Sequence, residues 1–246
     1  MKLIMLIFLA LNLTACASYM TRKSCEATNW YDYGQKVAME GRRLSGDQFI
    51  LECYKAEGDV AESALDQGFK SGMERYCQPE TVFQTGKAGN FFSTEMCTGQ
   101  GMNVLLIKHR QGVLEFCQKS NGYSAGAKGK AYNKICPAQL EAQFMPEFNR
   151  GRKRYLATLV DENEKEISTL DRDLSRLKND MRIQQIELQR YSYVPKLPGD
   201  KQVDKSVEFS SQIRQLQSSI SAKETLQESL REKNRQIKME IVQLEN

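Results

Sequence analysis

Histidine is almost absent from this sequence, and so are the short motifs that mark metal and nucleotide sites. His109 is the only histidine among 246 residues, and no two cysteines have the CxxC or CxxCH spacing of zinc and haem sites. No Walker loop and no dinucleotide-binding GxGxxG motif occurs. The sequence therefore predicts a protein with no metal and no cofactor.

An excess of charge of one sign is also absent. Lys and Arg number 35 and Asp and Glu 31, with 17 and 15 in residues 1–150 and 18 and 16 in residues 151–246. This even division predicts no nucleic-acid partner. The mean hydropathy is −0.56. The one long apolar run, from Leu3 to Leu13, is shorter than the roughly 20 residues that span a bilayer.

That apolar run has the form of a secretory signal peptide, which we expect to occupy residues 1–15. It ends in Leu13-Thr14-Ala15-Cys16, which resembles the lipobox of bacterial lipoproteins, where the cysteine receives acyl chains such as palmitate. The alternative is an ordinary signal peptide followed by a chance cysteine. Since Ala17-Ser18 lacks the aspartate that retains lipoproteins in the inner membrane, we expect lipidation at Cys16, an outer-membrane location and a chain that faces the periplasm.

Residues 16–150 are expected to form one domain, in which cysteine and glycine recur with an offset of 40 residues. The segments YCQPETVFQTGKAGNFF (76–92) and FCQKSNGYSAGAKGKAY (116–132) both have an aromatic residue six positions after the cysteine and glycines at nine and twelve. A fainter first copy contains Cys25, Tyr31 and Gly34, with Val37 in place of the second glycine. Apolar residues at spacings of three and four predict short helices in these repeats.

Two pairs of residues have the spacing of a capping box, which marks the start of a helix. They are Ser45 with Gln48 and Asp59 with Glu62. Pro79 and Pro137 stand where the first turn of a helix tolerates proline.

The repeated glycines require a reason, because glycine inside a helix costs about 0.5–1 kcal/mol relative to alanine. We expect neighbouring helix backbones to approach each other closely at these positions. The alternative is a glycine-lined groove in which the aromatic rings of the repeats bind a small ligand or a glycan such as peptidoglycan. Those candidate binding residues are Tyr31, Phe83 and Tyr123.

After Cys16, six cysteines remain, and an exported protein can pair them as disulfides. Pairing within repeats would join Cys25 to Cys53, Cys77 to Cys97 and Cys117 to Cys136, and this pattern is preferred. Repeat symmetry also permits Cys53–Cys77 and Cys97–Cys117, so the sequence leaves the connectivity open.

Several of these segments together resemble the bacterial lipoproteins classed as domain of unknown function 2799. The resemblance rests on Cys25, Trp30 and Gly34, on GMERYCQP (72–79) with Gly68 before it, and on FQTGKAG (83–89), NGYSAGAKGKAYNKICPAQLE (121–141) and FNRGRKRY (148–155). It covers roughly residues 16–155 and departs from the family pattern at Val37 and after Cys97, where no proline follows. It implies a lipoprotein of the cell envelope and no established activity.

Residues 151–246 contain no cysteine, one further glycine besides Gly151, and two series of heptad-spaced apolar residues. We expect an antiparallel coiled-coil hairpin with a loop near residues 191–205. If Leu188 faces Phe209, then Asn163 faces Asn234, and two buried amides satisfy each other. Lys223 and Gln184 interrupt the apolar series. The fold class predicted for the whole chain is therefore all-α, with disulfide-stapled glycine-rich repeats before a long hairpin.

The sequence thus combines an expected lipid anchor, a disulfide-linked domain and a long helical hairpin, and it contains no catalytic motif. This combination predicts a structural or adaptor protein. It would bind another envelope protein, or a second copy of itself, through residues 151–246. A hydrolase that uses carboxylates such as Glu74 and Glu115 is a further alternative. His109 has helical spacing with Gly112 and Phe116 and is interpreted as a surface or packing residue.

Overall fold

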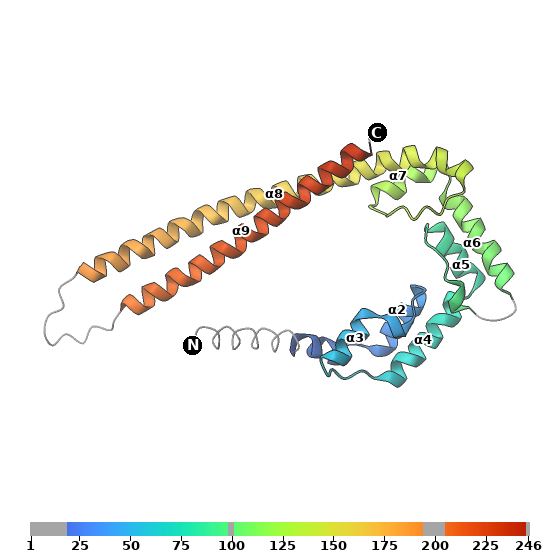
Figure 1. The fold of residues 1–246 in the computed structure, drawn as a ribbon, viewed down its shortest axis with the longest axis horizontal. Helices are drawn as coiled ribbons and strands as arrows, with labels where there is room; N and C mark the ends of the chain where they lie inside the picture. The colour runs from blue at the N-terminus through green and yellow to red at the C-terminus, as the bar shows by residue number, and fades with distance from the viewer. Residues whose placement is uncertain (1–18, 98–100, 194–204, 245–246) are drawn as a thin grey trace, which may run out of the picture. The chain divides into compact units, whose positions relative to one another are not determined.

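The computed structural model describes residues 19–97, 101–193 and 205–244, and within these ranges its regular structure is entirely helical. Helical residues 19–26 are followed by the helices shown in Figure 1, with short 3-10 turns at Leu44–Gly46 and Thr94–Met96. The helices are α2 (Trp30–Met39), α3 (Gln48–Lys55), α4 (Glu62–Tyr76), α5 (Pro79–Lys87), α6 (Met102–Phe116), α7 (Lys119–Ala127), α8 (Ala138–Tyr193) and α9 (Lys205–Gln243). The all-α fold class is confirmed. None of the helices in the described part is long and apolar enough to cross a membrane.

The chain divides into two compact units. One consists of Met1–Gly122 with Ala131–Met145, and the other of Tyr123–Lys130 with Pro146–Asn246. The expected boundary between residues 150 and 151 falls inside α8. The expected signal peptide and Cys16 lie outside the described residues, as does most of the expected loop near 191–205.

The starts of α3 and α5 show how local sequence sets helix boundaries. Asp47 caps α3, since its side chain accepts a hydrogen bond from the backbone N–H of Ile50. The expectation of a cap at Ser45 was wrong, because Ser45 lies in a 3-10 turn. Pro79 occupies the first turn of α5, as predicted.

The start of α4 also differs from the expectation. Ala61 precedes its first residue and makes no side-chain hydrogen bond, so the capping box expected at Asp59 is not formed. The backbone carbonyl of Asp59 instead accepts a hydrogen bond from the indole N–H of Trp30 at 3.1 Å.

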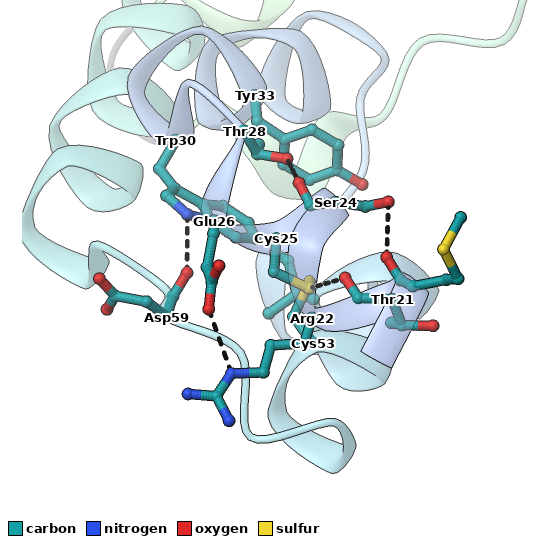
Figure 2. Close-up of a disulfide and its surroundings, with 12 residues drawn as sticks. Thr21, Arg22, Ser24, Cys25, Glu26, Thr28, Trp30, Tyr33, Cys53 and Asp59 are labelled. Carbon is teal, nitrogen blue, oxygen red and sulfur yellow. Dashed lines mark hydrogen bonds and ion pairs between the residues drawn. A yellow bond between two sulfur atoms is a disulfide. The ribbon is translucent and has the colours of Figure 1, made fainter. Parts of the chain in front are cut away.

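The structure contains the disulfides that pair cysteines within repeats. Their S–S distances are 2.10, 1.98 and 2.05 Å, and they join Cys25 to Cys53, Cys77 to Cys97 and Cys117 to Cys136. The first disulfide is fully buried, and Trp30, Ile50 and Leu65 complete its apolar cluster. Figure 2 shows Trp30 next to this bridge, with its indole N–H directed at Asp59.

In the second unit, α8 and α9 run antiparallel and side by side (Figure 1). Early residues of α8 meet late residues of α9. Arg152 pairs with Glu240 and Asp173 with Lys223, while the rings of Tyr191 and Phe209 lie 6.4 Å apart. These pairs follow the predicted hairpin register.

Candidate functional site

The helices of each repeat cross at a pair of glycines. A Cβ added to Gly86 of α5 would overlap the backbone carbonyl of His109 in α6, and one added to Gly112 of α6 would overlap the carbonyl of Phe83 in α5. Each glycine thus lies against the backbone of the opposite helix. This confirms the interpretation that the glycines permit close helix packing.

The same crossing occurs in the other two repeats. In α7 and α8, Gly126 lies against the carbonyl of Phe148 and Gly151 against that of Tyr123. In α2 and α4, Gly34 and Gly68 have equivalent contacts. The space beside these glycines is therefore filled by backbone, which leaves no room there for a ligand.

In each repeat, a further glycine follows the end of the first helix. This glycine lies against an aromatic ring of the second helix of the same repeat. Gly89 and Gly129 have φ of +75° and +74°, and a Cβ on either would meet the ring of Phe116 or Tyr155. In the first repeat Gly41, at φ +70°, has this role beneath Tyr76. Gly41 lies seven positions after the crossing glycine Gly34, whereas Gly89 lies only three after Gly86, so α2 continues about one turn further beyond its crossing. Val37 therefore lies inside the helix and is fully buried, which explains the departure noted at that position.

The candidate binding residues Tyr31, Phe83 and Tyr123 lie in three different helix pairs. Each stands three residues before the first glycine of its crossing, and its carbonyl is the group that the opposite glycine contacts. The ammonium of Lys87 lies 5.6 Å from the centre of the Phe83 ring, and the guanidinium of Arg150 lies 4.9 Å from that of Tyr123. Tyr31 is 39% exposed. The backbones of these three residues thus take part in the helix crossings, while ligand binding by their side chains stays a prediction.

The residues considered for catalysis are engaged elsewhere or exposed. The Nε2 atom of His109 lies 2.9 Å from the carbonyl of Asn90, and its ring packs at 5.9 Å from that of Phe92. Glu115 forms an ion pair with Lys87 at 2.9 Å, whereas Glu74 is exposed on α4. Across the described residues, no group of three or more His, Cys, Asp or Glu side chains could hold a metal ion.

Residues 122–126, GYSAG, match the letters of the GxSxG nucleophile elbow, a signal that the sequence interpretation passed over. The elbow requires a sharp turn between a strand and a helix. Here Ser124 lies within α7 and Gly126 forms a helix crossing. The match therefore indicates packing and not a nucleophile.

Asp47 is a charged residue that sequence reasoning missed, and it is 2% exposed. Besides capping α3, its carboxylate accepts hydrogen bonds from the hydroxyl of Tyr33 at 2.7 Å and from the guanidinium of Arg42. Burial acts to raise the pKa of Asp47, but the bonds from Tyr33, Ile50 and Arg42 outweigh it and lower that pKa. Burial and the bond to Asp47 raise the pKa of Tyr33 to about 12. The arrangement locks α2 to α3.

The interface between α8 and α9 contains pairs of polar side chains as well as leucines. Asn163 donates to Asn234 at 2.7 Å, which confirms the predicted pairing of these amides. Gln227, 6% exposed, donates to Asp171 at 2.6 Å, and the ammonium of Lys223 reaches Asp173 at 2.9 Å. These partners explain how Gln227 and Lys223 are tolerated in the heptad series.

The part of the α8–α9 hairpin far from the α7–α8 crossing is the least closed. No side chain described at 175–192 or 205–219 is buried, whereas Leu156, Leu170, Leu174, Ile220 and Leu230 are buried nearer the crossings. Within these ranges Ile183, Ile186 and Val207 are 45%, 39% and 65% exposed. Gln184 as a whole is partly exposed, but its side-chain carbonyl oxygen is buried and has no hydrogen-bond partner among the described residues. We call residues 175–192 and 205–219 the distal hairpin.

Comparison with protein families gives one match. Residues 29–112 and 106–153 match the family described as a protein of unknown function, DUF2799, and these overlapping segments cover just over half of the chain. They contain the three glycine crossings. No curated protein and no solved structure matches the chain.

Proposed function

This chain belongs to the DUF2799 family of unknown function, and we propose that it is a non-catalytic, lipid-anchored adaptor of the cell envelope. In this proposal acyl chains on Cys16 hold it to the outer membrane, facing the periplasm. The disulfide-stapled repeats form a rigid base, and the α8–α9 hairpin binds another envelope protein as a coiled-coil arm.

The observation that carries the proposal is the open distal hairpin. Two helices alone cover only one side of each apolar stripe, and here Ile183, Ile186 and Val207 remain in solvent. An additional helix packed against these side chains would bury them and stabilise the assembly by the hydrophobic effect, at about 25 cal/mol per Å² of apolar surface removed from water. A partner helix is the element best suited to such a stripe.

Photo-crosslinking in cells tests the adaptor function. A photoreactive amino acid replaces Arg172 or Arg231, which are exposed on α8 and α9, or Ile186 in the distal hairpin. We expect a discrete crosslinked envelope protein from these positions, with the highest yield at Ile186.

The matched control places the same amino acid at Glu52, which is exposed on α3 in the other unit. Equal yields from Glu52 and from the hairpin positions would show non-specific proximity. Crosslinks that join only copies of this chain would replace the adaptor by a self-assembling scaffold. No crosslink from any hairpin position would contradict the proposal.

A further inference from the structure

Helix α6 has apolar side chains on more than one side. Leu105, Val113 and Phe116 are buried, and Gly112 lies against the backbone of α5, which runs beside α6 (Figure 1). Helix α9 has four strongly exposed large apolar side chains in 39 residues, whereas α6 has four in 15. Those of α6 are between 39% and 58% exposed, and we call them the α6 apolar face: Val104, Leu106, Ile107 and Leu114.

Three side chains of the α6 apolar face form one stripe along the helix. Ile107 lies three residues after Val104 and seven before Leu114, and at 3.6 residues per turn this spacing places all three on the side away from the buried Phe116. Leu106 widens the stripe at one edge. A helix that is apolar on every side is normally covered on every side. Exposed apolar patches mark contacts with proteins or membranes, so the α6 apolar face indicates a binding surface.

Basic side chains lie on both flanks of the α6 apolar face. Lys108 follows Ile107 on one flank, and Arg110 lies on the other. Both are exposed, and within the described part of the chain neither forms an ion pair. No Asp or Glu occurs in residues 97–114. The acidic residues at either end of this segment are held in ion pairs with other basic residues: Glu95 with Arg43 and Glu115 with Lys87.

We propose that the α6 apolar face binds the surface of an anionic phospholipid bilayer. In an interfacial helix the apolar side chains enter the boundary between headgroups and acyl chains, and flanking Lys and Arg attract the anionic headgroups. The stems of Lys108 and Arg110 can follow the apolar surface while their charged ends stay in water. Protein interfaces depend instead on Trp, Tyr and Arg, with Leu and Val under-represented among the residues that dominate binding.

This contact goes beyond the proposed adaptor function. It requires neither acyl chains on Cys16 nor the distal hairpin, because α6 belongs to the unit that contains the disulfides. An aliphatic stripe flanked by only two basic side chains predicts weak and reversible membrane binding, which supplements an anchor and does not replace it.

Vesicle sedimentation tests this proposal with residues 16–246 carrying Cys16→Ser, so that neither the expected signal peptide nor an acyl chain contributes. The vesicles contain phosphatidylcholine alone or with one third of phosphatidylglycerol. We expect binding to the anionic vesicles that salt weakens, and about tenfold weaker binding to the neutral ones. The Val104→Gln, Ile107→Gln double variant should bind the anionic vesicles about tenfold or more weakly, because both side chains lose their burial in the bilayer.

The matched control replaces two exposed apolar side chains of the other unit, Leu226→Gln with Met239→Gln, and should bind within about twofold of the parent chain. A second test variant, Lys108→Gln with Arg110→Gln, should lose about tenfold on anionic vesicles and little on neutral ones. Circular dichroism establishes that each variant stays folded.

Three results would overturn the proposal. They are no binding of the parent chain to anionic vesicles, equal loss of binding in the Val104, Ile107 variant and its control, and unchanged binding of the Lys108, Arg110 variant. A photoreactive amino acid at Ile107 then identifies the other occupants in cells. A discrete crosslinked protein, or crosslinks between two copies of this chain, in the absence of vesicle binding would assign the α6 apolar face to that partner.

These outcomes are separate from those of the adaptor proposal. The vesicle experiment leaves the distal hairpin intact, and crosslinking from Ile186 leaves the α6 apolar face intact. Failure of one proposal therefore does not imply failure of the other.

Discussion

Single glycines set the distance between the helices of each repeat. Because Gly112 lies against the carbonyl of Phe83, its replacement by alanine would force α5 and α6 apart. We expect Gly112→Ala to lower the free energy of unfolding by about 1–3 kcal/mol or more, the usual cost of overpacking. Chemical denaturation followed by circular dichroism measures this change.

Gly46→Ala is the matched control for that prediction. An added Cβ at Gly46 meets no atom within 4 Å, so the variant should be neutral or slightly stabilised. Equal destabilisation by Gly46→Ala and Gly112→Ala would contradict the packing role of the crossing glycines.

The buried carboxylate of Asp47 should make stability depend on pH. The pKa of Asp47 is lower in the folded protein than in the unfolded chain, where it is about 3.9. Its contribution is therefore fully present above that pH and is lost as the pH falls through the folded pKa. Asp47→Asn should lower the free energy of unfolding by about 1–3 kcal/mol at neutral pH and by progressively less in acid.

Denaturation of both proteins across a series of pH values measures that difference. Asp66→Asn, which alters an exposed carboxylate paired with Lys70, serves as control and should change little. A stability difference between parent and Asp47→Asn that does not shrink in acid would show that the carboxylate charge is unimportant.

At the scale of elements, the hairpin register depends on the Asn163–Asn234 pair. Asn163→Ile leaves the amide of Asn234, 5% exposed, without its partner. We therefore expect the single variant to be less stable than the Asn163→Ile, Asn234→Ile double variant, because an unsatisfied buried amide costs about 1–3 kcal/mol. Thermal unfolding compares the two; a double variant as unstable as the single one argues against the pairing.

The disulfides stabilise the repeats and not the hairpin. Their sequence separations are 28, 20 and 19 residues, and closing a loop of this size contributes about 3 kcal/mol in the chain-entropy model. Reduction should therefore destabilise residues 17–150 sharply while most helicity of residues 151–246 persists. Hydrogen exchange with and without reductant distinguishes the two segments, and equal loss of protection in both would contradict the prediction.

At the scale of the whole molecule, membrane attachment should depend on one residue. Cys16→Ser removes the proposed acylation site, and acyl chains contribute roughly 0.8 kcal/mol per buried CH₂. We expect the variant in the soluble fraction at high salt, where electrostatic adsorption of the chain to the membrane surface is screened. Ala17→Gly, next to the same site, should stay with the membrane, and membrane retention of Cys16→Ser at high salt would exclude the lipobox.

Much of the architecture could be predicted because its determinants are local or periodic. The spacing of cysteine and glycine indicated the helix repeats, and the cysteines that pair are close in sequence. The heptad series indicated two long helices, and their antiparallel course then aligned Asn163 with Asn234. In each case a short distance along the chain, or a constant period, implies the contact.

Other features were decided only by the tertiary structure. Asp47 meets Tyr33 because α2 and α3 pack together, and no spacing distinguishes it from the other carboxylates. The prediction of a capping box at Ser45 was wrong, because the helix is capped by Asp47 two residues later, while Ser45 lies in a 3-10 turn. The glycine-lined groove considered from the sequence is filled because each glycine faces a backbone from another part of its repeat.

The sequence by itself thus determined that the chain is helical, and it indicated a preferred disulfide pattern and, with Leu188 placed opposite Phe209, the hairpin register, since each follows from local spacing or a constant period. Only the tertiary structure decided which glycines meet and how Asp47 is buried. The physical reason is that helix crossings join residues about 22 to 37 positions apart, and neither periodicity nor composition specifies which residues then become neighbours.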